Sequence, residues 1–507
     1  MAYVIGIDCG TSGTKTVLFD ECGKVIASDT KEYNLYQPQN GYAEQDPSDW
    51  VNAMAETVRS VILKSGISSD KIVGVGISGQ MHGLVMLDKD GKVLRNSIIW
   101  CDQRTTAEVE LMNKIVGKDK LIEITANPAL TGWTAAKILW VRNNEPEIYD
   151  KCRHILLPKD YLRYILTGEF ASEVSDASGM QLLNVGKRQW SKEICSLLDI
   201  DFSWLGKLYE SSEVTGKITK SASQLTGLRE GTIVVGGAGD NAAAAVGMGV
   251  CKDGKAFTTI GTSGVVFAHT SDISIDLKGR VHTCCAAVPD SWHVMGVTQS
   301  AGLSLKWFRD NFCSAEKEAA KQMNIDEYSL MNKEAENVPI GSNRLLYLPY
   351  LMGERTPYLD PDARGVFIGL SAIHTKRDML RAVMEGVSYS LRDCIEVFKE
   401  MKINISDMAI CGGGGKSALW RSMLSDLYKC PVKTTKSEEG PALGAAILAM
   451  VGAGIYSSVE EACEMIVKDD KIQDPVSANS KEYEKYYKLY KKIYPSLKDN
   501  FAELARL

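Results

Sequence analysis

Two short hydrophobic runs on either side of a polar, glycine-rich turn occur twice, once in each half of the chain. The first copy places residues 4–7 and 16–19 around Gly10-Thr11-Ser12-Gly13, and the second places residues 256–260 and 265–268 around Gly261-Thr262-Ser263-Gly264. Apolar runs of this length around a small polar turn predict a β-hairpin. Because the same pattern begins each half, the repeat predicts two similarly built domains.

The boundary between these domains is predicted near residue 248, which divides the chain into residues 1–248 and 249–507. Residues 231–239 have the pattern of a strand that runs into a glycine-rich turn, and residues 241–246 have the pattern of a short helix. A short helix after such a turn is expected to form a flexible junction between the two halves.

Helical and strand-like patterns are mixed elsewhere, as an α/β architecture requires. Asp46-Pro47 has the form of a helix start, and the apolar residues after it recur at helical spacing on one face, at Trp50, Met54, Val58 and Val61. Tyrosines at helical spacing between residues 483 and 494 predict an amphipathic helix that covers its own domain.

Two glycine-rich stretches resemble nucleotide-binding motifs in the wrong setting. Residues 74–79 fit the dinucleotide pattern G-x-G-x-x-G, but residues 84–92 predict a strand and a tight turn instead of the helix that a Rossmann unit needs. Residues 411–417 end like a phosphate-binding P-loop, but Ile410 occupies the position of the first glycine. Neither motif is assigned, although the glycines at 412–415 can still approach a nucleotide closely.

The composition favours a protein that acts on small molecules. The 507 residues are 45% hydrophobic and 24% charged, with a net charge of -6 and no dense block of Lys or Arg, so no nucleic-acid partner is expected. No apolar stretch has the length of a membrane span, and the strand pattern from Tyr3 leaves no room for a signal peptide. Thirteen cysteines without Cys-x-x-Cys spacing favour reduced thiols. A cytoplasmic protein without a membrane partner is therefore expected.

Several residues have the chemistry that phosphoryl transfer needs, namely a cradle for phosphates, a metal ligand and a base. The backbone and hydroxyl groups of the two Gly-Thr-Ser-Gly turns can bind phosphate, although ordinary hairpin turns are the alternative. Asp8, at the end of its strand, is a candidate Mg²⁺ ligand or a solvated acid. Asp240 is a candidate general base or the N-cap of the helix that follows, and the local sequence favours neither.

One further segment is a candidate for binding a sugar. Gln80-Met81-His82-Gly83 follows a strand in the first half and places a hydrogen-bonding histidine where it can contact sugar hydroxyls. The alternative is that His82 has a structural role, as an isolated histidine usually does.

Together these residues resemble the FGGY carbohydrate kinases, a branch of the actin and Hsp70-like ATPase superfamily, over nearly the whole chain. Two stretches resemble the signatures of that family: residues 132–140 with Asn143-Asn144, and residues 365–370 continuing through Asp378 and Ala382 to Glu385. The resemblance implies an α/β fold with two ribonuclease H-like domains on either side of a central cleft. It also implies an ATP-dependent sugar kinase.

The resemblance implies roles for most of the candidate residues. The acid at Asp240 corresponds to the general base, and Asp8 corresponds to the acid that supports metal and phosphate, with Asp8 and Asp240 together as the Mg²⁺ ligands. The expected ATP-binding residues are Gly10, Thr11, Ser12, Gly13, Lys15, Gly261, Thr262, Ser263, Gly412, Gly413, Gly414 and Gly415. The last four correspond to the adenosine side of the nucleotide site.

Within the family, residues 80–83, residues 157–163 and Ser175-Asp176-Ala177 are most similar to the members that phosphorylate D-xylulose to D-xylulose 5-phosphate. The expected sugar-binding residues are Gln80, Met81, His82, Trp100, Asp102, Asp240 and Asn241. Cys101 stands where those members usually have Asn, so another pentulose or polyol (ribulose, L-xylulose or glycerol) is an alternative substrate. An ATPase that phosphorylates no sugar is a second alternative, and the resemblance implies a homodimer.

Overall fold

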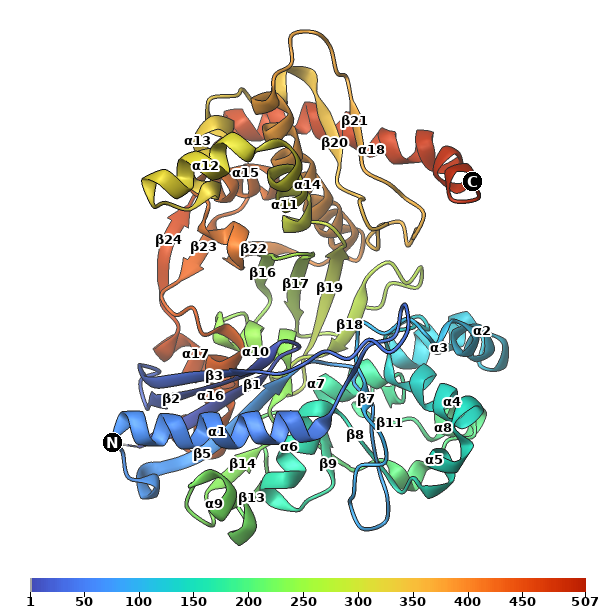
Figure 1. The fold of residues 1–507 in the computed structure, drawn as a ribbon, viewed down its shortest axis with the longest axis vertical. Helices are drawn as coiled ribbons and strands as arrows, with labels where there is room; N and C mark the ends of the chain where they lie inside the picture. The colour runs from blue at the N-terminus through green and yellow to red at the C-terminus, as the bar shows by residue number, and fades with distance from the viewer. Residues whose placement is uncertain (1) are drawn as a thin grey trace.

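The computed structural model describes residues 2–507, and it contains two seven-stranded mixed sheets, one in each half of the chain (Figure 1). In spatial order the first sheet contains β13 (Val214–Lys217), β14 (Ile233–Val235), β5 (Ile72–Gly79), β1 (Tyr3–Cys9), β2 (Gly13–Asp20) and β3 (Val25–Glu32), with β15 (Ala238–Gly239) also paired to β5. The second contains β18 (His282–Cys285), β19 (Trp292–Thr298), β17 (Gly264–Thr270), β16 (Gly254–Ile260), β22 (Ile405–Cys411), β23 (Val432–Thr435) and β24 (Asp469–Gln473).

Short strands outside these sheets form two-stranded pairs. They are β4 (Glu44–Gln45) with β7 (Ser97–Ile98), β6 (Val85–Leu87) with β8 (His154–Leu156), β9 (Ala171–Glu173) with β12 (Lys207–Tyr209), β10 (Leu183–Asn184) with β11 (Gln189–Trp190), and β20 (Leu346–Leu348) with β21 (Val366–Ile368).

Helices surround both sheets. Along the sequence they fall into two groups, those before and those after residue 248. The first half contains α1 (Pro47–Ser65), α2 (Thr106–Ile115), α3 (Lys118–Thr125), α4 (Thr134–Asn144), α5 (Pro146–Lys151), α6 (Pro158–Thr167), α7 (Val174–Ala177), α8 (Lys192–Leu198), α9 (Lys220–Thr226) and α10 (Asp240–Gly247). The second contains α11 (Gly302–Phe312), α12 (Ser314–Met323), α13 (Glu327–Glu336), α14 (Lys376–Glu400), α15 (Ala418–Tyr428), α16 (Gly440–Gly452), α17 (Val459–Ile466) and α18 (Ser477–Leu504).

The two predicted hairpins are confirmed, and they occupy equivalent places in the two sheets. β1 pairs antiparallel with β2 so that Asp8 lies opposite Lys15, and β16 pairs antiparallel with β17 so that Ile260 lies opposite Gly264. The first strand of each hairpin also pairs in parallel with a later strand, β1 with β5 and β16 with β22. Both turns therefore stand at the edge of a sheet where parallel strands end.

The two predicted amphipathic helices are also confirmed. α1 begins at Pro47 with Asp46 as its N-cap, whose carboxylate accepts a hydrogen bond from the Ser48 amide. Its predicted apolar face is completely buried, at Trp50, Met54, Val58 and Val61. α18 buries Tyr483, Tyr487, Tyr490 and Tyr494 in the hydrophobic core of the second half.

α16, although it belongs to the second half of the sequence, packs on the first sheet against β1 and β5. This packing requires glycine, because a Cβ atom would lie 2.0 Å from the Ala442 carbonyl oxygen at Gly6 and 1.9 Å from the Ala445 carbonyl oxygen at Gly76. Gly76 belongs to the G-x-G-x-x-G pattern, and β5 is followed by β6 instead of a helix, so the glycine pattern serves helix packing.

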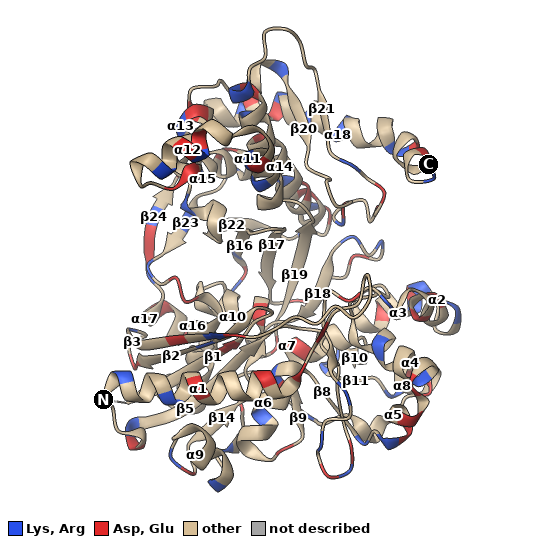
Figure 2. Cartoon of the chain, viewed as in Figure 1, with Lys and Arg blue, Asp and Glu red and all other residues tan. Residues whose placement is uncertain are grey.

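Charged residues of both signs are interspersed on the outer helices in Figure 2, for example on α12 and α13. Within residues 2–507, no helix combines the length and the apolar character that crossing a bilayer requires.

Candidate active site

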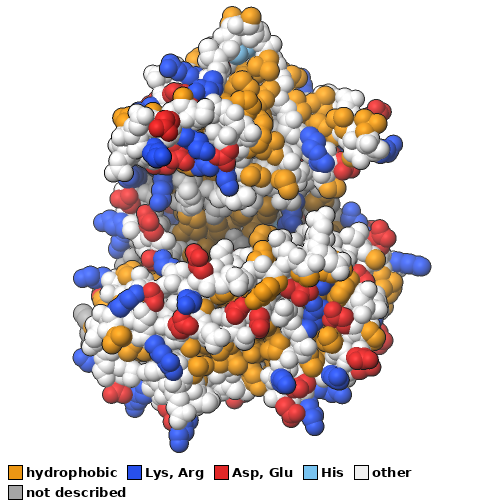
Figure 3. Space-filling model, in the orientation of Figure 1, with side chains coloured by type: hydrophobic (Ala, Val, Ile, Leu, Met, Phe, Trp, Pro, Cys, Tyr) orange, Lys and Arg blue, Asp and Glu red, His pale blue; other side chains and the backbone are white. Residues whose placement is uncertain are grey.

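The surface is hollowed between the two halves of the molecule, with hydrophobic side chains deep in the hollow (Figure 3). Three parallel strands of the first sheet end side by side: Cys9 pairs with Gly79, and Gly239 pairs with Gly79 from the other side. Because carboxyl ends of parallel strands share one edge, the residues at and just after these ends come together there. This edge brings together Asp8, Gln80 and Asp240, which the sequence predicts to be functional.

Asp240 is the first residue of α10 and has one carboxylate oxygen without a protein partner. Its Oδ1 accepts hydrogen bonds from the Asn241 amide at 2.7 Å and from Asn241 Nδ2 at 2.9 Å. Within the described chain, Oδ2 accepts none. Gly239 holds the cap position, so the helix begins one residue earlier than predicted and the alternative of Asp240 as an N-cap is wrong.

Burial and the nearby Asp8 carboxylate raise the pKa of Asp240 to about 6, while the bonds from Asn241 act in the opposite direction. Burial also raises the pKa of Asp8, opposed by a 3.1 Å hydrogen bond from the Ser78 hydroxyl and by the charge of Lys15. A base whose pKa lies near neutrality is partly ready to accept a proton at physiological pH.

The first Gly-Thr-Ser-Gly turn is closed by a hydrogen bond from the Gly10 amide to the Gly13 carbonyl at 3.0 Å. Ser12 at its tip is exposed, and the Thr11 hydroxyl accepts a 2.9 Å bond from the Trp100 indole. Lys15, just after the turn, forms an ion pair of 2.5 Å with Glu439, which precedes α16.

The second turn is similar but is held by a helix. The Gly261 amide donates to the Ser263 carbonyl at 3.0 Å, and the first two amides of α11, at Gly302 and Leu303, donate to the Gly261 and Thr262 carbonyls at 2.8 and 3.1 Å. Gly261 and Thr262 are exposed. The turn is therefore rigid at its base and accessible at its tip.

A cavity of about 520 Å³ opens beside the second turn. Its walls come from the turn, the first residues of α11, the helix α13 and the glycine-rich segment after β22; they include Ile260, Thr262, Leu303, Lys306, Tyr328, Asn332, Gly413, Gly414 and Ser417. Gly412 and Gly414 pack so closely on Ile260 that a Cβ atom would lie 2.8 Å from its carbonyl oxygen and 2.5 Å from its Cγ2. Of the four predicted glycines, Gly413 and Gly414 therefore line a cavity adjoining the predicted phosphate turn, and Gly412 packs beside it on Ile260.

Residues 80–83 contact two different parts of the site, the first Gly-Thr-Ser-Gly turn and the backbone just before Asp240. Gln80 is buried, and its Nε2 donates to the Gln45 Oε1 at 2.8 Å and, weakly, to the Gly10 carbonyl at 3.4 Å. Met81 packs on the backbone just before Asp240, because a Cβ atom at Gly239 would lie 2.8 Å from Met81 Cγ. Gln80 thus supports the phosphate turn, while Met81 borders Asp240.

His82 has an unusual backbone conformation that several side chains maintain. Its φ angle is 68°, in the left-handed region that non-glycine residues rarely adopt. The Lys137 ammonium and the Thr134 hydroxyl donate to its carbonyl oxygen at 2.8 and 3.0 Å. Its ring stacks on Trp133, with centroids 4.5 Å apart and an interplanar angle of 21°.

These three contacts come from α4 and the residue before it, inside the first signature-like stretch. Trp133, Thr134 and Lys137 belong to residues 132–140, a stretch from which the sequence predicts family membership but no role for these side chains. Their helical spacing was visible, but the fact that they face the His82 carbonyl depends on tertiary packing. Burial lowers the pKa of Lys137 to about 7, which shows how far this ammonium is removed from water.

Trp100 and Asp102 differ in their access to a ligand. The Trp100 side chain is 45% exposed beside the first turn. Asp102 is completely buried, and its carboxylate accepts hydrogen bonds from the Ala43 amide at 2.6 Å and from Arg104, whose NH2 lies 2.8 Å away. A direct contact of Asp102 with a sugar would have to replace bonds of this ion pair.

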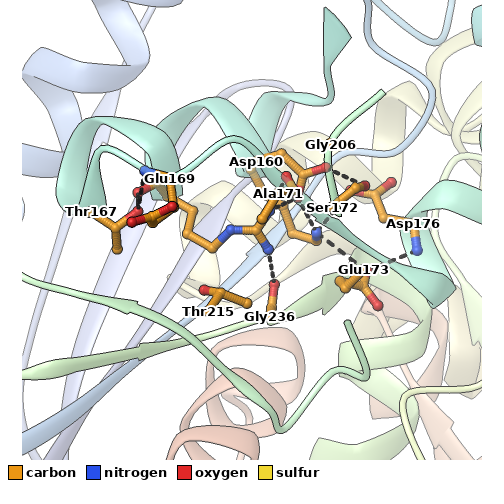
Figure 4. Close-up of polar contacts among 12 residues, drawn as sticks. Asp160, Thr167, Glu169, Ala171, Ser172, Glu173, Asp176, Gly206, Thr215 and Gly236 are labelled. Atoms are coloured by element: carbon orange, nitrogen blue, oxygen red, sulfur yellow. Dashed lines mark hydrogen bonds and ion pairs between the residues drawn. The ribbon is translucent and has the colours of Figure 1, made fainter. Parts of the chain in front are cut away.

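Figure 4 shows a cluster of buried charged residues that includes Asp160, Glu173 and Asp176 and lies close to Gly236, which precedes Asp240 in the chain. Lys159 contacts Asp160 at 2.7 Å, Glu173 at 3.2 Å and Asp176 at 3.4 Å. Arg163 pairs with Asp160 and donates to the Ala171 carbonyl and, at 3.0 Å, to the Gly236 carbonyl.

The cluster holds the chain that leads into Asp240. Gly236 and Gly237 form the turn between β14 and β15, and the Gly239 amide donates to the Ser175 hydroxyl at 3.1 Å. Glu173 in turn accepts from that hydroxyl at 2.8 Å. The ionic contacts of α6 and α7 thus extend, through one hydroxyl and one carbonyl, to the backbone beside Asp240.

A bound Mg²⁺ needs few protein ligands. No group of three or more His, Cys, Asp or Glu side chains converges as a metal centre among the residues that the structure describes. Asp8 and Asp240 lie close enough for the charge of Asp8 to raise the pKa of Asp240. Because Mg²⁺ in phosphoryl-transfer sites is usually held by one or two carboxylates plus substrate phosphates and water, this pair fits such an ion.

Comparisons with known proteins agree over the whole chain. Residues 3–247 match the N-terminal domain, and residues 256–453 the C-terminal domain, of the FGGY family of carbohydrate kinases. The chain is 42% identical over 499 residues to the xylulose kinase of Bacillus subtilis, covering 98% of both chains.

Two solved structures have the same fold throughout. A ligand-bound xylulose kinase from Lactobacillus acidophilus superposes with a TM-score of 0.92 at 27% identity, covering 99% of this chain and 100% of that one. A gluconate kinase from the same organism gives the same TM-score and identity, covering 99% of both chains.

Proposed function

Since the chain belongs to the FGGY family of carbohydrate kinases, we propose that it transfers the γ-phosphoryl group of ATP to D-xylulose and forms D-xylulose 5-phosphate. The observation that carries this proposal is the contact between Met81 and Gly239, which joins the predicted sugar segment to the predicted base. The near full-length similarity to a xylulose kinase supports the choice of sugar.

Asp240 acts as the general base in this proposal. Its Oδ2 has no partner in residues 2–507, so it can accept the proton of the sugar's terminal hydroxyl as that hydroxyl attacks phosphorus in line. Asn241 holds the other oxygen through two hydrogen bonds and so fixes the carboxylate plane. Met81 and His82 orient the sugar along the cleft.

The two Gly-Thr-Ser-Gly turns bind the phosphates, and the cavity beside the second turn binds the adenosine. Lys15 exchanges Glu439 for phosphate oxygens when nucleotide is present. Asp8 and Asp240 would hold Mg²⁺, which neutralises charge on the phosphates when bound. Phosphoryl transfer to the sugar without hydrolysis of ATP requires water to be excluded from the site. The proposal therefore includes closure of two domains, residues 1–248 and 249–507, over the substrates.

A panel of sugars in a coupled assay for ADP release tests the substrate. D-xylulose is expected to give the highest kcat/KM, above D-ribulose, L-xylulose, glycerol and gluconate. A higher value for any of the others would contradict the proposed substrate while leaving a sugar kinase. Release of ADP that no sugar stimulates would contradict the phosphoryl acceptor altogether.

We also infer the compartment and the assembly. All thirteen cysteines are free thiols, as expected for a protein of the reducing cytoplasm. A homodimer, which the family resemblance implies, stays a prediction that sedimentation equilibrium of the purified protein tests.

A further inference from the structure

A second histidine, from the other half of the chain, lies beside the predicted sugar segment. His282 begins β18 and is 6% exposed. Its ring centroid lies 5.4 Å from that of Trp133, at an interplanar angle of 42°, and the same indole stacks on His82. The two imidazoles therefore share one aromatic neighbour, although they are 200 residues apart along the chain.

Hydrogen bonds fix the tautomer of His282. Asn127 Nδ2 donates to the Thr125 carbonyl at 2.9 Å and to the Thr283 carbonyl at 2.8 Å, which uses both of its hydrogens. Asn127 Oδ1 is therefore an acceptor, and His282 Nδ1 donates to it at 3.1 Å. Burial lowers the pKa of His282 to about 3, so the ring is neutral and Nε2 carries a lone pair.

The same reasoning applies to His82. Its Nδ1 lies 2.9 Å from the Gly179 carbonyl, which only accepts, so Nδ1 is the donor. Burial lowers the pKa of His82 to about 3, so its Nε2 is also an acceptor. Neither Nε2 has a hydrogen-bonding partner in the part of the chain that the structure describes. Two acceptors without a donor are thus present near the sugar segment.

A charged donor is placed next to them. Arg355 lies between β20 and β21. The adjacent Thr356 donates hydrogen bonds to the carbonyl of Arg280, two residues before β18, at 2.8 Å and to the Val297 carbonyl of β19 at 3.0 Å. These two bonds hold Arg355 beside the part of the second sheet that carries His282, and the charge of Arg355 accordingly adds to burial in lowering the pKa of both His282 and His82.

The guanidinium of Arg355 has no ion-pair or hydrogen-bonding partner among residues 2–507. The neighbouring Glu354 carboxylate is occupied elsewhere, accepting from the Thr298 hydroxyl at 2.6 Å and the Gln299 amide at 3.0 Å. Arg355 is half-buried, and this burial lowers the pKa of its guanidinium, opposed by the charge of Glu354. A polar ligand at this place would satisfy it.

An open-chain 2-ketose has the complementary groups at the end remote from its terminal hydroxyl. With that hydroxyl at Asp240, the chain passes Met81 and His82 and reaches His282 and Arg355 with its C1 hydroxyl and C2 carbonyl. A hydroxyl can donate to Nε2. A ketone oxygen only accepts, in the plane of its sp² lone pairs, and so suits a planar guanidinium donor; the C2 hydroxyl of a polyol can also accept, but from a tetrahedral carbon that places its oxygen differently.

We propose that His282 and Arg355 bind the carbonyl end of the sugar, with the C1 hydroxyl donating to His282 Nε2 and the C2 carbonyl accepting from Arg355, and so select 2-ketoses over polyols. This inference rests on the proposed function, because it needs the sugar's terminal hydroxyl at Asp240. Since both side chains come from the second half of the chain, the sugar joins the two halves directly.

The test measures the affinity of D-xylulose and of xylitol, which has a hydroxyl in place of the carbonyl, by calorimetry with Arg355→Met, Arg355→Lys and His282→Phe. Arg355→Met is expected to weaken D-xylulose binding about 10- to 100-fold and xylitol binding much less, since it removes a charged hydrogen bond to the carbonyl. Arg355→Lys should restore part of the affinity. His282→Phe is expected to weaken both ligands, which share the C1 hydroxyl.

Arg229→Met is the matched control, because Arg229 is exposed and pairs only loosely with Asp70, at 3.7 Å. Thermal melting and ATP affinity identify any variant that is misfolded. If Arg355→Met is misfolded, the sugar affinities of Arg355→Lys and His282→Phe test the proposed contacts instead. Equal losses of D-xylulose and xylitol affinity in Arg355→Met, or unchanged D-xylulose binding in either Arg355→Met or His282→Phe, would overturn the inference while the wild-type kinase activity still stood. If the wild-type protein prefers another 2-ketose, the same affinities are measured with that sugar. If it phosphorylates only polyols or sugar acids, both the proposed substrate and the proposed carbonyl contacts are refuted.

Discussion

At the scale of single residues, the first prediction follows from the different surroundings of the two Asp240 oxygens: Oδ1 is hydrogen-bonded to Asn241, and Oδ2, without a partner in residues 2–507, is free to act as a base. Asp240→Asn keeps the bonds to Asn241 in a similar geometry but removes the base, so kcat is expected to fall about 10²- to 10⁴-fold. Affinity for ATP should change little. The measurement is kcat in the coupled assay together with calorimetric titration of nucleotide.

The control for this variant is Asp29→Asn, which removes a surface carboxylate that pairs with Lys64. It is expected to keep wild-type turnover. Near-normal turnover by Asp240→Asn would remove Asp240 from the role of base.

The second prediction concerns pH. Because burial and Asp8 raise the pKa of Asp240 to about 6, kcat/KM for the sugar is expected to decrease about tenfold per pH unit below that value, as the base becomes protonated. Measurement of kcat/KM from pH 5 to 8 at saturating Mg-ATP checks this, and a profile that stays flat down to pH 5 would contradict it.

Protonation of Asp240 does not destabilise the folded protein, so acid unfolding caused by this residue does not explain the expected loss of kcat/KM. The pKa of Asp240 is higher in the folded protein than its ordinary value of 3.8, so the folded state binds this proton more tightly. Protonation of Asp240 therefore favours the folded state as the pH falls from about 6 toward 4. A thermal melt at each pH separates the two effects.

The third prediction concerns Lys137, which we regard as a positioning residue for His82. Lys137→Met removes the donor at 2.8 Å from the His82 carbonyl, in a backbone region that is unfavourable without support. We expect KM for the sugar to rise about tenfold, since roughly 1.4 kcal/mol of orientation is lost, while KM for ATP stays unchanged.

Lys114→Met, on the exposed surface of α2, is the control for general effects of losing a lysine. Steady-state kinetics with each substrate varied in turn gives both KM values. A rise in both together would indicate a structural role for Lys137 instead of a specific one.

The sequence was sufficient to predict where Asp8, Asp240 and the two Gly-Thr-Ser-Gly turns lie, because each lies at or just after a strand end that can be recognised from its apolar run. It did not indicate how Gln80 and Asp102 are held. That both bind sugar stays a prediction, and in the structure both also bind protein groups, Gly10 and Arg104 among them. Which way a polar side chain turns depends on partners distant in sequence, and the local pattern carries no information on these.

At the scale of secondary-structure elements, the buried charges of α6 and α7 predict a large effect on stability. Arg163→Met leaves Asp160 with one cation fewer and leaves the Ala171 and Gly236 carbonyls without their donor. Breaking one side of a buried ionic network typically costs about 3–5 kcal/mol of unfolding free energy. Urea denaturation should show a loss of this size.

Two outcomes distinguish this network from an ordinary surface contact. Lys220→Met, at the start of α9, is expected to change the unfolding free energy by less than about 0.5 kcal/mol. An equally small change for Arg163→Met would mean that water replaces the guanidinium. In that case the cluster would not be what holds the segment before Asp240.

At this scale the sequence also predicted the amphipathic helices α1 and α18 well, because each buries one periodic face, α1 on β2 and β3 and α18 on α14, α15 and β20. The glycine pattern at residues 74–79 was harder to interpret. Rejection as a dinucleotide motif followed from the strand after it, but the reason for the glycines is α16, whose backbone lies 1.9 Å from where a Cβ of Gly76 would be. Nothing near residue 76 in the sequence indicates that helix.

At the scale of the whole molecule, the division of the sequence differs from the division in space. α16 and α17 follow residue 248, yet they share a hydrophobic core with Val4, Val17 and Phe19 of the first sheet. α10 packs on α16 so closely that a Cβ atom at Gly444 would lie 1.8 Å from the Ala243 carbonyl oxygen. The first sheet is therefore completed by a segment, residues 440–466, that is synthesised about 200 residues after the sheet itself.

This arrangement predicts that residues 1–248 do not fold alone. Without α16 and α17, one face of β1 and β5 is left uncovered, and the loss of that apolar burial removes more free energy than a domain has to spare. The fragment should be soluble only when residues 440–466 are supplied, either as a peptide or fused after residue 248. Circular dichroism during thermal denaturation measures this: the fused form is expected to unfold cooperatively and residues 1–248 are not. Cooperative unfolding of residues 1–248 by themselves would show that the first half is an independent domain, and that α16 joins the two halves only after each has folded.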